Sequence, residues 1–197
     1  MKVFIAVLVL IFSLQSWTKA DDISDFEIEG MSVGDSLLDY FSLSDIKNNK
    51  KNFYNDNKFS ISHLDNFKTF YFGKLYDAIQ FSYKSNDKKY IIHGISALID
   101  FSNSIKKCKQ KKREIVKEIK SIFTNPDIKN DTISHPVDKT GKSKVYRTSF
   151  QINSSYKYFP IDVACFDFTK KTGMGDHLRL GIKTDEYNDW LHNKAYQ

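Results

Sequence analysis

One stretch of the chain, residues 104–123, has the periodicity of an amphipathic helix. Residues three and four apart share one face of an α-helix, and a helix with one apolar stripe has to bury it against another element. The sequence therefore predicts one long helix here, closed by Pro126, that packs on another layer of structure. The apolar side chains that recur at spacings of three, four and seven are Ile105, Cys108, Ile115, Ile119 and Ile122.

The stretches on both sides of this helix alternate between apolar and polar residues, which is typical of β-strands. Residues 76–84 and 90–101 alternate on either side of a short polar turn and predict an antiparallel hairpin. Gly94, inside the second of these strands, indicates a bulge or a close approach of another group to the backbone. Further strands are predicted over residues 67–72, 143–152, 160–168 and 177–183.

The rest of the chain predicts short helices and polar segments. Residues 185–196 predict a C-terminal helix, and short N-terminal helices are expected before residue 47, one of them opened by a capping box of Ser42 and Asp45. The polar residues 47–65 and 124–142 are predicted to be an exposed connector and a loop. The predicted fold class is α+β, an antiparallel sheet of about five to six strands packed against one long amphipathic helix.

The start of the chain has the pattern of a secretory signal peptide. Lys2 is followed by an apolar run over residues 3–14, and small residues precede a cut after Ala20. The run is too short to span a bilayer comfortably, and no later segment is apolar enough for a membrane helix. The sequence therefore predicts a signal peptide at residues 1–20, one soluble domain over residues 21–197, and a periplasmic or secreted location.

Disulfides form in oxidising compartments, so the predicted export makes the two cysteines, Cys108 and Cys165, candidates for one bond. We expect a disulfide between the long helix and a strand, closing a loop of about 58 residues. The alternative is a pair of buried free thiols. Glycosylation sequons begin at Asn130 and Asn153, and they matter only if the chain is made in a eukaryote.

The formal net charge of +6 is carried almost entirely by lysine, because only three of the 30 basic residues are arginine. Lysine has AT-rich codons, so genome composition explains the high isoelectric point as readily as a binding surface does. Nucleic-acid readers favour arginine, so nucleic acid is not an expected partner. The outer face of the 104–123 helix is the candidate surface for an acidic protein or an anionic membrane. Its candidate binding residues are Lys106, Lys109, Arg113, Lys117 and Lys120.

A serine hydrolase is the alternative function. The string V-G-D-S-L around Ser36 resembles the first block of the GDSL (SGNH) esterase family, and a D-x-x-H string lies near the C-terminus as in that family. The parallel βαβ alternation of the family is absent, and the simpler reading is that Asp35 caps a helix. The resemblance implies a nucleophile, a base, an orienting carboxylate and an oxyanion donor, which are Ser36, His192, Asp189 and Asn130.

Two other patterns in the sequence give weaker indications of a functional site. Residues 138–143 look like the end of a phosphate-binding loop, but Pro136 stands where that pattern needs glycine and a strand is predicted next, which favours a turn. The five histidines lack the spacings of known metal sites, so neither a metal nor a cofactor is expected.

Residues 27–42, E-I-E-G-M-S-V-G-D-S-L-L-D-Y-F-S, resemble the opening of a group of small exported bacterial proteins of uncharacterised function. The resemblance implies export and no particular activity. Together with the signal peptide and the lysine-rich helix, it predicts an exported, non-catalytic binding or envelope-accessory domain.

Overall fold

The computed structural model describes residues 26–65, 75–102, 104–123, 125–153 and 158–197. The predicted signal peptide and the predicted strand at residues 67–72 lie outside the described residues. No helix within those ranges is long and apolar enough to cross a membrane. The strands are β1 (Lys50–Lys51), β2 (Phe59–Asp65), β3 (Ala78–Lys84), β4 (Ile92–Asp100), β5 (Asp127–Ser134), β6 (Lys144–Asn153), β7 (Tyr158–Asp167) and β8 (His177–Lys183). The helices are η2 (Leu37–Asp39), α1 (Leu43–Asn48), α2 (Ile105–Ile122), η3 (Lys170–Thr172) and α3 (Asp185–Asn193).

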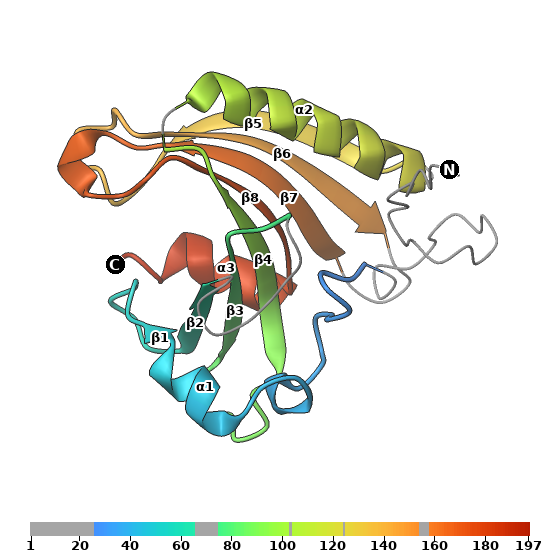
Figure 1. Ribbon diagram of the computed structural model, residues 1–197, viewed down its shortest axis with the longest axis vertical. Coiled ribbons are helices and arrows are strands. Elements are labelled where there is room, and N and C mark those ends of the chain that lie inside the picture. The colour runs from blue at the N-terminus through green and yellow to red at the C-terminus, as the bar shows by residue number, and fades with distance from the viewer. Residues whose placement is uncertain (1–25, 66–74, 103, 124, 154–157) are drawn as a thin grey trace, which may run out of the picture.

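The eight strands form one antiparallel sheet in the order β1-β2-β3-β4-β8-β7-β6-β5 (Figure 1). Strands β2 to β4 form one meander of sequence neighbours, and β5 to β8 form another. The α2 helix connects the two meanders, and the second returns until β8 pairs with β4, with Arg179 opposite Leu98. This arrangement confirms the predicted α+β class, the long helix packed on the sheet and the C-terminal helix.

The sheet has eight strands, rather than the predicted five or six, because two polar segments also form strands. The predicted 47–65 connector contains β1 and β2, where the buried Ser62 hydroxyl donates to the Ile46 carbonyl oxygen at 2.8 Å. Small polar residues can therefore be buried in β2 with their hydrogen bonds satisfied. The predicted 124–142 loop contains β5, an edge strand whose mostly exposed side chains show no apolar alternation.

Different elements cover the two faces of the sheet. On one face, Phe81 of β3 lies in an apolar core with Ile119 of α2. On the other face, Phe59 of β2 packs against Trp190 of α3, with ring centroids 5.1 Å apart. Successive side chains of a strand point to opposite sides, which is why Ser62 reaches α1 while Phe59 reaches α3. The two long helices therefore lie on opposite faces.

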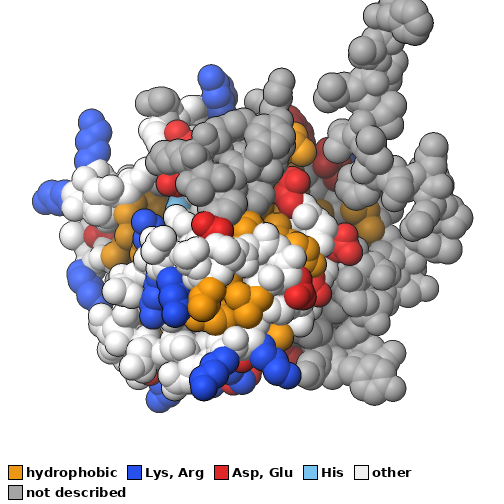
Figure 2. Space-filling model, turned by 60° about the horizontal axis from the view of Figure 1, so that its bottom comes forward, with side chains coloured by type: hydrophobic (Ala, Val, Ile, Leu, Met, Phe, Trp, Pro, Cys, Tyr) orange, Lys and Arg blue, Asp and Glu red, His pale blue; other side chains and the backbone are white. Residues whose placement is uncertain are grey.

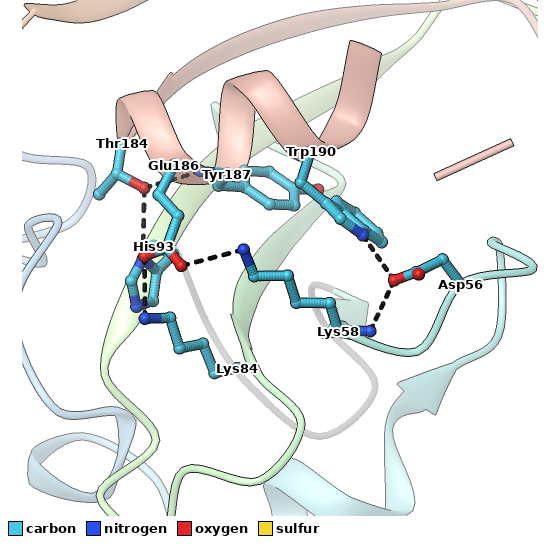
Figure 3. A network of polar contacts seen from close by, with 8 residues as sticks. All are labelled: Asp56, Lys58, Lys84, His93, Thr184, Glu186, Tyr187 and Trp190. Atoms are coloured by element: carbon cyan, nitrogen blue, oxygen red, sulfur yellow. Dashed lines mark hydrogen bonds and ion pairs between the residues drawn. The ribbon is translucent and has the colours of Figure 1, made fainter. Parts of the chain in front are cut away.

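The first turn of α3 is held by a cap and by charges (Figure 3). The Thr184 hydroxyl accepts a hydrogen bond from the Tyr187 backbone N–H at 3.2 Å, which satisfies one free donor of the helix terminus. The Glu186 carboxylate lies between two ammonium groups, 3.1 Å from Lys58 and 2.8 Å from Lys84. Lys58 directly precedes β2 and Lys84 ends β3, so these ion pairs fix this end of α3 to the edge of the sheet.

Two aromatic residues of α3 rest on the sheet beneath it. A Cβ atom added to Gly94 would lie 3.0 Å from the ring of Tyr187, so this ring approaches the backbone of β4 closely. The register also shifts between Ser82 and Tyr83 of β3, opposite this point. Both observations confirm what Gly94 indicated in the sequence. The Trp190 indole N–H donates to Asp56 at 2.6 Å, which joins α3 to the segment before β2.

The string at residues 138–143 is a turn leading into β6, as its sequence favoured. The Asp138 carboxylate accepts hydrogen bonds from the backbone N–H and the hydroxyl of Thr140, at 2.9 and 2.6 Å. It also accepts from the backbone N–H and the hydroxyl of Ser143, at 2.9 and 2.7 Å. These hydrogen bonds, the Thr140 hydroxyl first among them, hold the pKa of Asp138 well below its ordinary value.

This depressed pKa predicts an acid-sensitive turn. A carboxylate whose pKa falls on folding stabilises the folded state above its unfolded pKa, and that contribution is lost as the pH falls toward the folded value. Asp138→Asn should therefore lower the free energy of unfolding at neutral pH, and the difference from the wild type should shrink below about pH 4. Urea titrations of both proteins at about pH 7 and about pH 3 measure this difference in the free energy of unfolding. A difference that stays the same at both pH values would contradict the role of the charge.

Candidate functional site

The α2 helix is fixed to the sheet by its core contacts and by a covalent bond. Its N-cap is Ser104, whose hydroxyl accepts from the Lys107 backbone N–H at 3.3 Å. One turn later, Cys108 forms a disulfide with Cys165 of β7, with 5.9 Å between the Cα atoms. The structure thus confirms the predicted bridge between the helix and a strand. Because the inner face of α2 is held in this way, its outer face presents side chains in fixed positions.

Four basic residues form a line along the exposed outer face of α2. Their positions, seven, four and three residues apart, keep them within one narrow sector of the helix. Among the described residues none of the four forms an ion pair, and Glu114 of the same helix pairs with Lys111 at 3.5 Å instead. We refer to this line as the cationic stripe, and its members are Lys106, Arg113, Lys117 and Lys120.

Lys109 was predicted to belong to the same surface, but its side chain takes another direction. It is half-buried, and its ammonium nitrogen lies 3.3 Å from the centroid of the Tyr146 ring on β6. This contact places its charge over an aromatic face instead of in open solvent. Lys112 is also half-buried, and burial lowers the pKa of its ammonium group. Both lysines therefore lie at the flank of α2 and outside the cationic stripe.

The opposite end of the molecule carries no comparable line on the face that Figure 2 shows. With the bottom of Figure 1 turned forward, most Lys and Arg side chains lie toward the edge of the view, and one cationic group lies nearer its centre. A patch of hydrophobic side chains lies among them.

The residues of the serine-hydrolase alternative take part in separate local contacts. The Ser36 hydroxyl donates to the Lys89 carbonyl oxygen at 2.7 Å and also accepts from the Leu38 backbone N–H as the cap of η2. Ser36, and not Asp35, is therefore the cap residue of this short helix. Asn130 lies on the edge strand β5 and accepts from the Thr148 hydroxyl at 2.6 Å.

The two C-terminal members of that alternative lie on α3, where their spacing is one helical turn. His192 uses its Nδ1 atom for the Asn188 carbonyl oxygen at 2.8 Å, and the Asp189 carboxylate accepts from the Asn193 side chain at 2.7 Å. Across the described ranges, no hydrogen bond joins Ser36, Asp189 and His192 to one another. The structure therefore does not assemble a Ser-His-Asp arrangement. In the same ranges, no group of three or more His, Cys, Asp or Glu side chains converges as a metal site.

Sequence reasoning missed a row of charged residues on the α3 face of the sheet. Arg147 of β6 donates two hydrogen bonds to Asp131 of β5, at 2.6 and 3.1 Å. On β7 the Asp162 carboxylate accepts from the Ser149 hydroxyl and pairs with the Lys183 ammonium group. The available signal was the polar member of each apolar–polar alternation in β6 to β8, although alternation alone does not say which strands are neighbours.

Comparisons with known proteins add little to these observations. No family model matches the chain, and no curated protein matches it either. A solved structure of a mutant of protein Mog1 is similar over 75% of this chain and 85% of that chain, with 13% identity and a TM-score of 0.31. The likeness is distant.

Proposed function

We propose that the mature chain is an exported, non-catalytic binding protein that docks on anionic membrane surfaces through the cationic stripe of α2. The observation that carries this proposal is the line of four exposed cations without ion pairs, on a helix that a disulfide and an apolar core hold in place. Unpaired exposed cations attract anionic lipid head groups and lose that attraction when salt screens them.

The composition of the stripe favours a membrane over an acidic protein. Protein interfaces derive most of their affinity from buried aromatic and arginine anchors, whereas three of the four stripe residues are lysine and none is aromatic. From Lys106 to Lys120 the stripe extends about 21 Å along the helix, so its charges can reach several head groups of a fluid surface at once. At about 1 kcal/mol per charge near such a surface, the four would contribute about 4 kcal/mol.

Vesicle sedimentation tests this proposal. The mature protein should pellet with vesicles of phosphatidylcholine mixed with phosphatidylglycerol, remain in the supernatant with pure phosphatidylcholine, and be released at about 1 M salt, where the screening length is about 3 Å. Equal behaviour with both vesicles would overturn the proposal. Binding to polyglutamate without binding to anionic vesicles would also overturn it, in favour of an acidic protein partner.

A further inference from the structure

The three arginines of the chain have different surroundings. Arg113 is exposed in the cationic stripe, and Arg147 is held in a two-point contact by Asp131. Arg179 lies on β8, on the face of the sheet that α3 covers, and within the described residues its guanidinium forms no hydrogen bond or ion pair. An arginine whose charge is partly removed from water normally has a carboxylate partner. Arg179 has no such partner among the described residues.

Aromatic rings surround this arginine. The Arg179 guanidinium carbon lies 4.9 Å from the centroid of the Phe166 ring, and the His177 ring stacks on the same phenyl ring with centroids 4.6 Å apart and planes within 10°. The His135 ring meets Phe168 at 5.0 Å and Tyr196 at 6.1 Å. All of these side chains are half-buried, so part of each remains open to solvent. We name them the Arg179 cluster: His135, Phe166, Phe168, His177, Arg179 and Tyr196.

The cross-strand pairing places His177 and Arg179 on the same face of the sheet, both in contact with Phe166. His177 and Arg179 are two residues apart on β8, so their side chains share a face, and His177 pairs directly with Phe166 of β7. Two buried side-chain polar atoms in the described part of the chain have no hydrogen-bond partner, Nε2 of His177 and Nε of Arg179. Both belong to this one cluster. Buried polar atoms are nearly always paired, so this coincidence indicates a ligand position.

The hydrogen bonds of His177 show what its free nitrogen can do. Nδ1 lies 3.0 Å from the Gly175 carbonyl oxygen, which can only accept, so Nδ1 carries the proton. Burial, together with the charge of Arg179, lowers the pKa of His177 to about 4, which leaves the ring neutral at physiological pH. Nε2 therefore carries an unpaired lone pair, and because the atom is buried, a ligand reaches it by displacing a neighbouring side chain. The cluster offers a cationic donor at Arg179 and a neutral acceptor at His177, beside the half-buried rings of Phe168 and Tyr196.

We propose that the Arg179 cluster binds a small organic carboxylate that carries an N–H or O–H group next to the carboxylate and an aromatic or aliphatic body. The carboxylate oxygens accept from the guanidinium of Arg179, whose flat side already rests on Phe166. The neighbouring N–H or O–H donates to Nε2 of His177, and the body of the ligand contacts the rings of Phe168 and Tyr196. This site lies on the opposite face of the sheet from the cationic stripe and is independent of membrane docking.

Two probes with this chemistry test the site on the mature full-length chain: N-acetyl-phenylalanine and phenyllactate. Calorimetry should show binding of both acids, with much weaker binding of N-acetyl-phenylalanine amide, which lacks the charge. In NMR spectra the ring signals of His177 should shift on addition of the acids. Absence of binding by both acids would overturn the proposal, and so would equal affinity for the acid and its amide.

Arginine variants separate a ligand site from a purely structural contact. Arg179→Met should weaken binding of the acids about 10- to 100-fold, as expected for loss of a charged hydrogen-bond partner, while Lys88→Met, in an exposed turn outside both sites, should leave it unchanged. Because Arg179 has no carboxylate to leave behind, Arg179→Met should keep or raise the melting temperature, whereas Arg147→Met, which strands Asp131, should lower it. Arg179→Lys, which keeps the charge and loses the planar fork, should fold and bind weakly. Unchanged binding by both Arg179 variants would overturn the proposal.

Discussion

Replacing Cys108 and Cys165 together by alanine should lower the free energy of unfolding by about 4 kcal/mol. The bridge joins α2 to β7 across a sequence separation of 57 residues, so it removes much chain entropy from the unfolded state. Both sulfurs are fully buried in a cluster with Leu178, and their loss also leaves a small unfilled volume. The effect should be largest at the N-terminal half of α2, where the covalent attachment lies.

Urea unfolding with and without a reductant measures this contribution. The reductant should lower the midpoint of the wild type and leave the midpoint of the Cys108→Ala, Cys165→Ala protein unchanged. The slope of the free energy of unfolding against urea concentration should stay similar, because both proteins expose nearly the same surface on unfolding. A double variant as stable as the oxidised wild type would contradict a structural role for the bridge.

Changing the four residues of the cationic stripe to glutamine should weaken binding to anionic vesicles about a thousandfold. Each charge near the surface contributes about 1 kcal/mol, and about 4 kcal/mol corresponds to nearly three factors of ten. All four side chains are exposed and unpaired, so the variant should fold with a similar melting temperature. Sedimentation with vesicles of graded phosphatidylglycerol content, at low ionic strength, gives the affinities.

A variant with the same net charge provides the control. Four other exposed lysines in turns, η3 and loops can be changed to glutamine, which lowers the net charge by the same amount and leaves the stripe intact. This control should retain most of its affinity, because surface charges more than about 10 Å from the lipid are screened. Equal losses in both variants would mean that total charge, and not the stripe, governs binding. The control positions are Lys88, Lys139, Lys142 and Lys170.

Elements with a strong apolar period were predictable from the sequence, and polar ones were not. One side of the α2 helix is apolar and packs on the core. Apolar and polar residues alternate clearly along β6 to β8. By contrast, β2 buries Ser60 and Ser62, whose hydroxyls hydrogen-bond the Ser85 hydroxyl and the Ile46 carbonyl oxygen, and β5 is an exposed edge strand. In both strands, pairing with a neighbouring strand and hydrogen bonds made by polar side chains replace the apolar signal.

Of the candidate sites, one was predictable from the sequence and the other was not. The cationic stripe follows from helical geometry alone, and only Lys109 departs from it, because Tyr146 of a neighbouring strand attracts its ammonium group. The Arg179 cluster depends on the register that places His177 opposite Phe166, and nothing local in the sequence specifies that register. The spacing of Asp189 and His192 resembled a catalytic block because one turn of a helix produces the same interval.

The most direct test of membrane docking is to ask which face of the protein the vesicle covers. Both native cysteines are in the disulfide, so Gln110→Cys places a single spin label on the exposed face of α2, between Lys106 and Arg113. Lys170→Cys labels η3 as a control. Addition of anionic vesicles should shield the label at position 110 from a water-soluble nickel chelate and leave position 170 accessible. Unchanged access at position 110, or greater shielding at position 170, would contradict docking through the stripe.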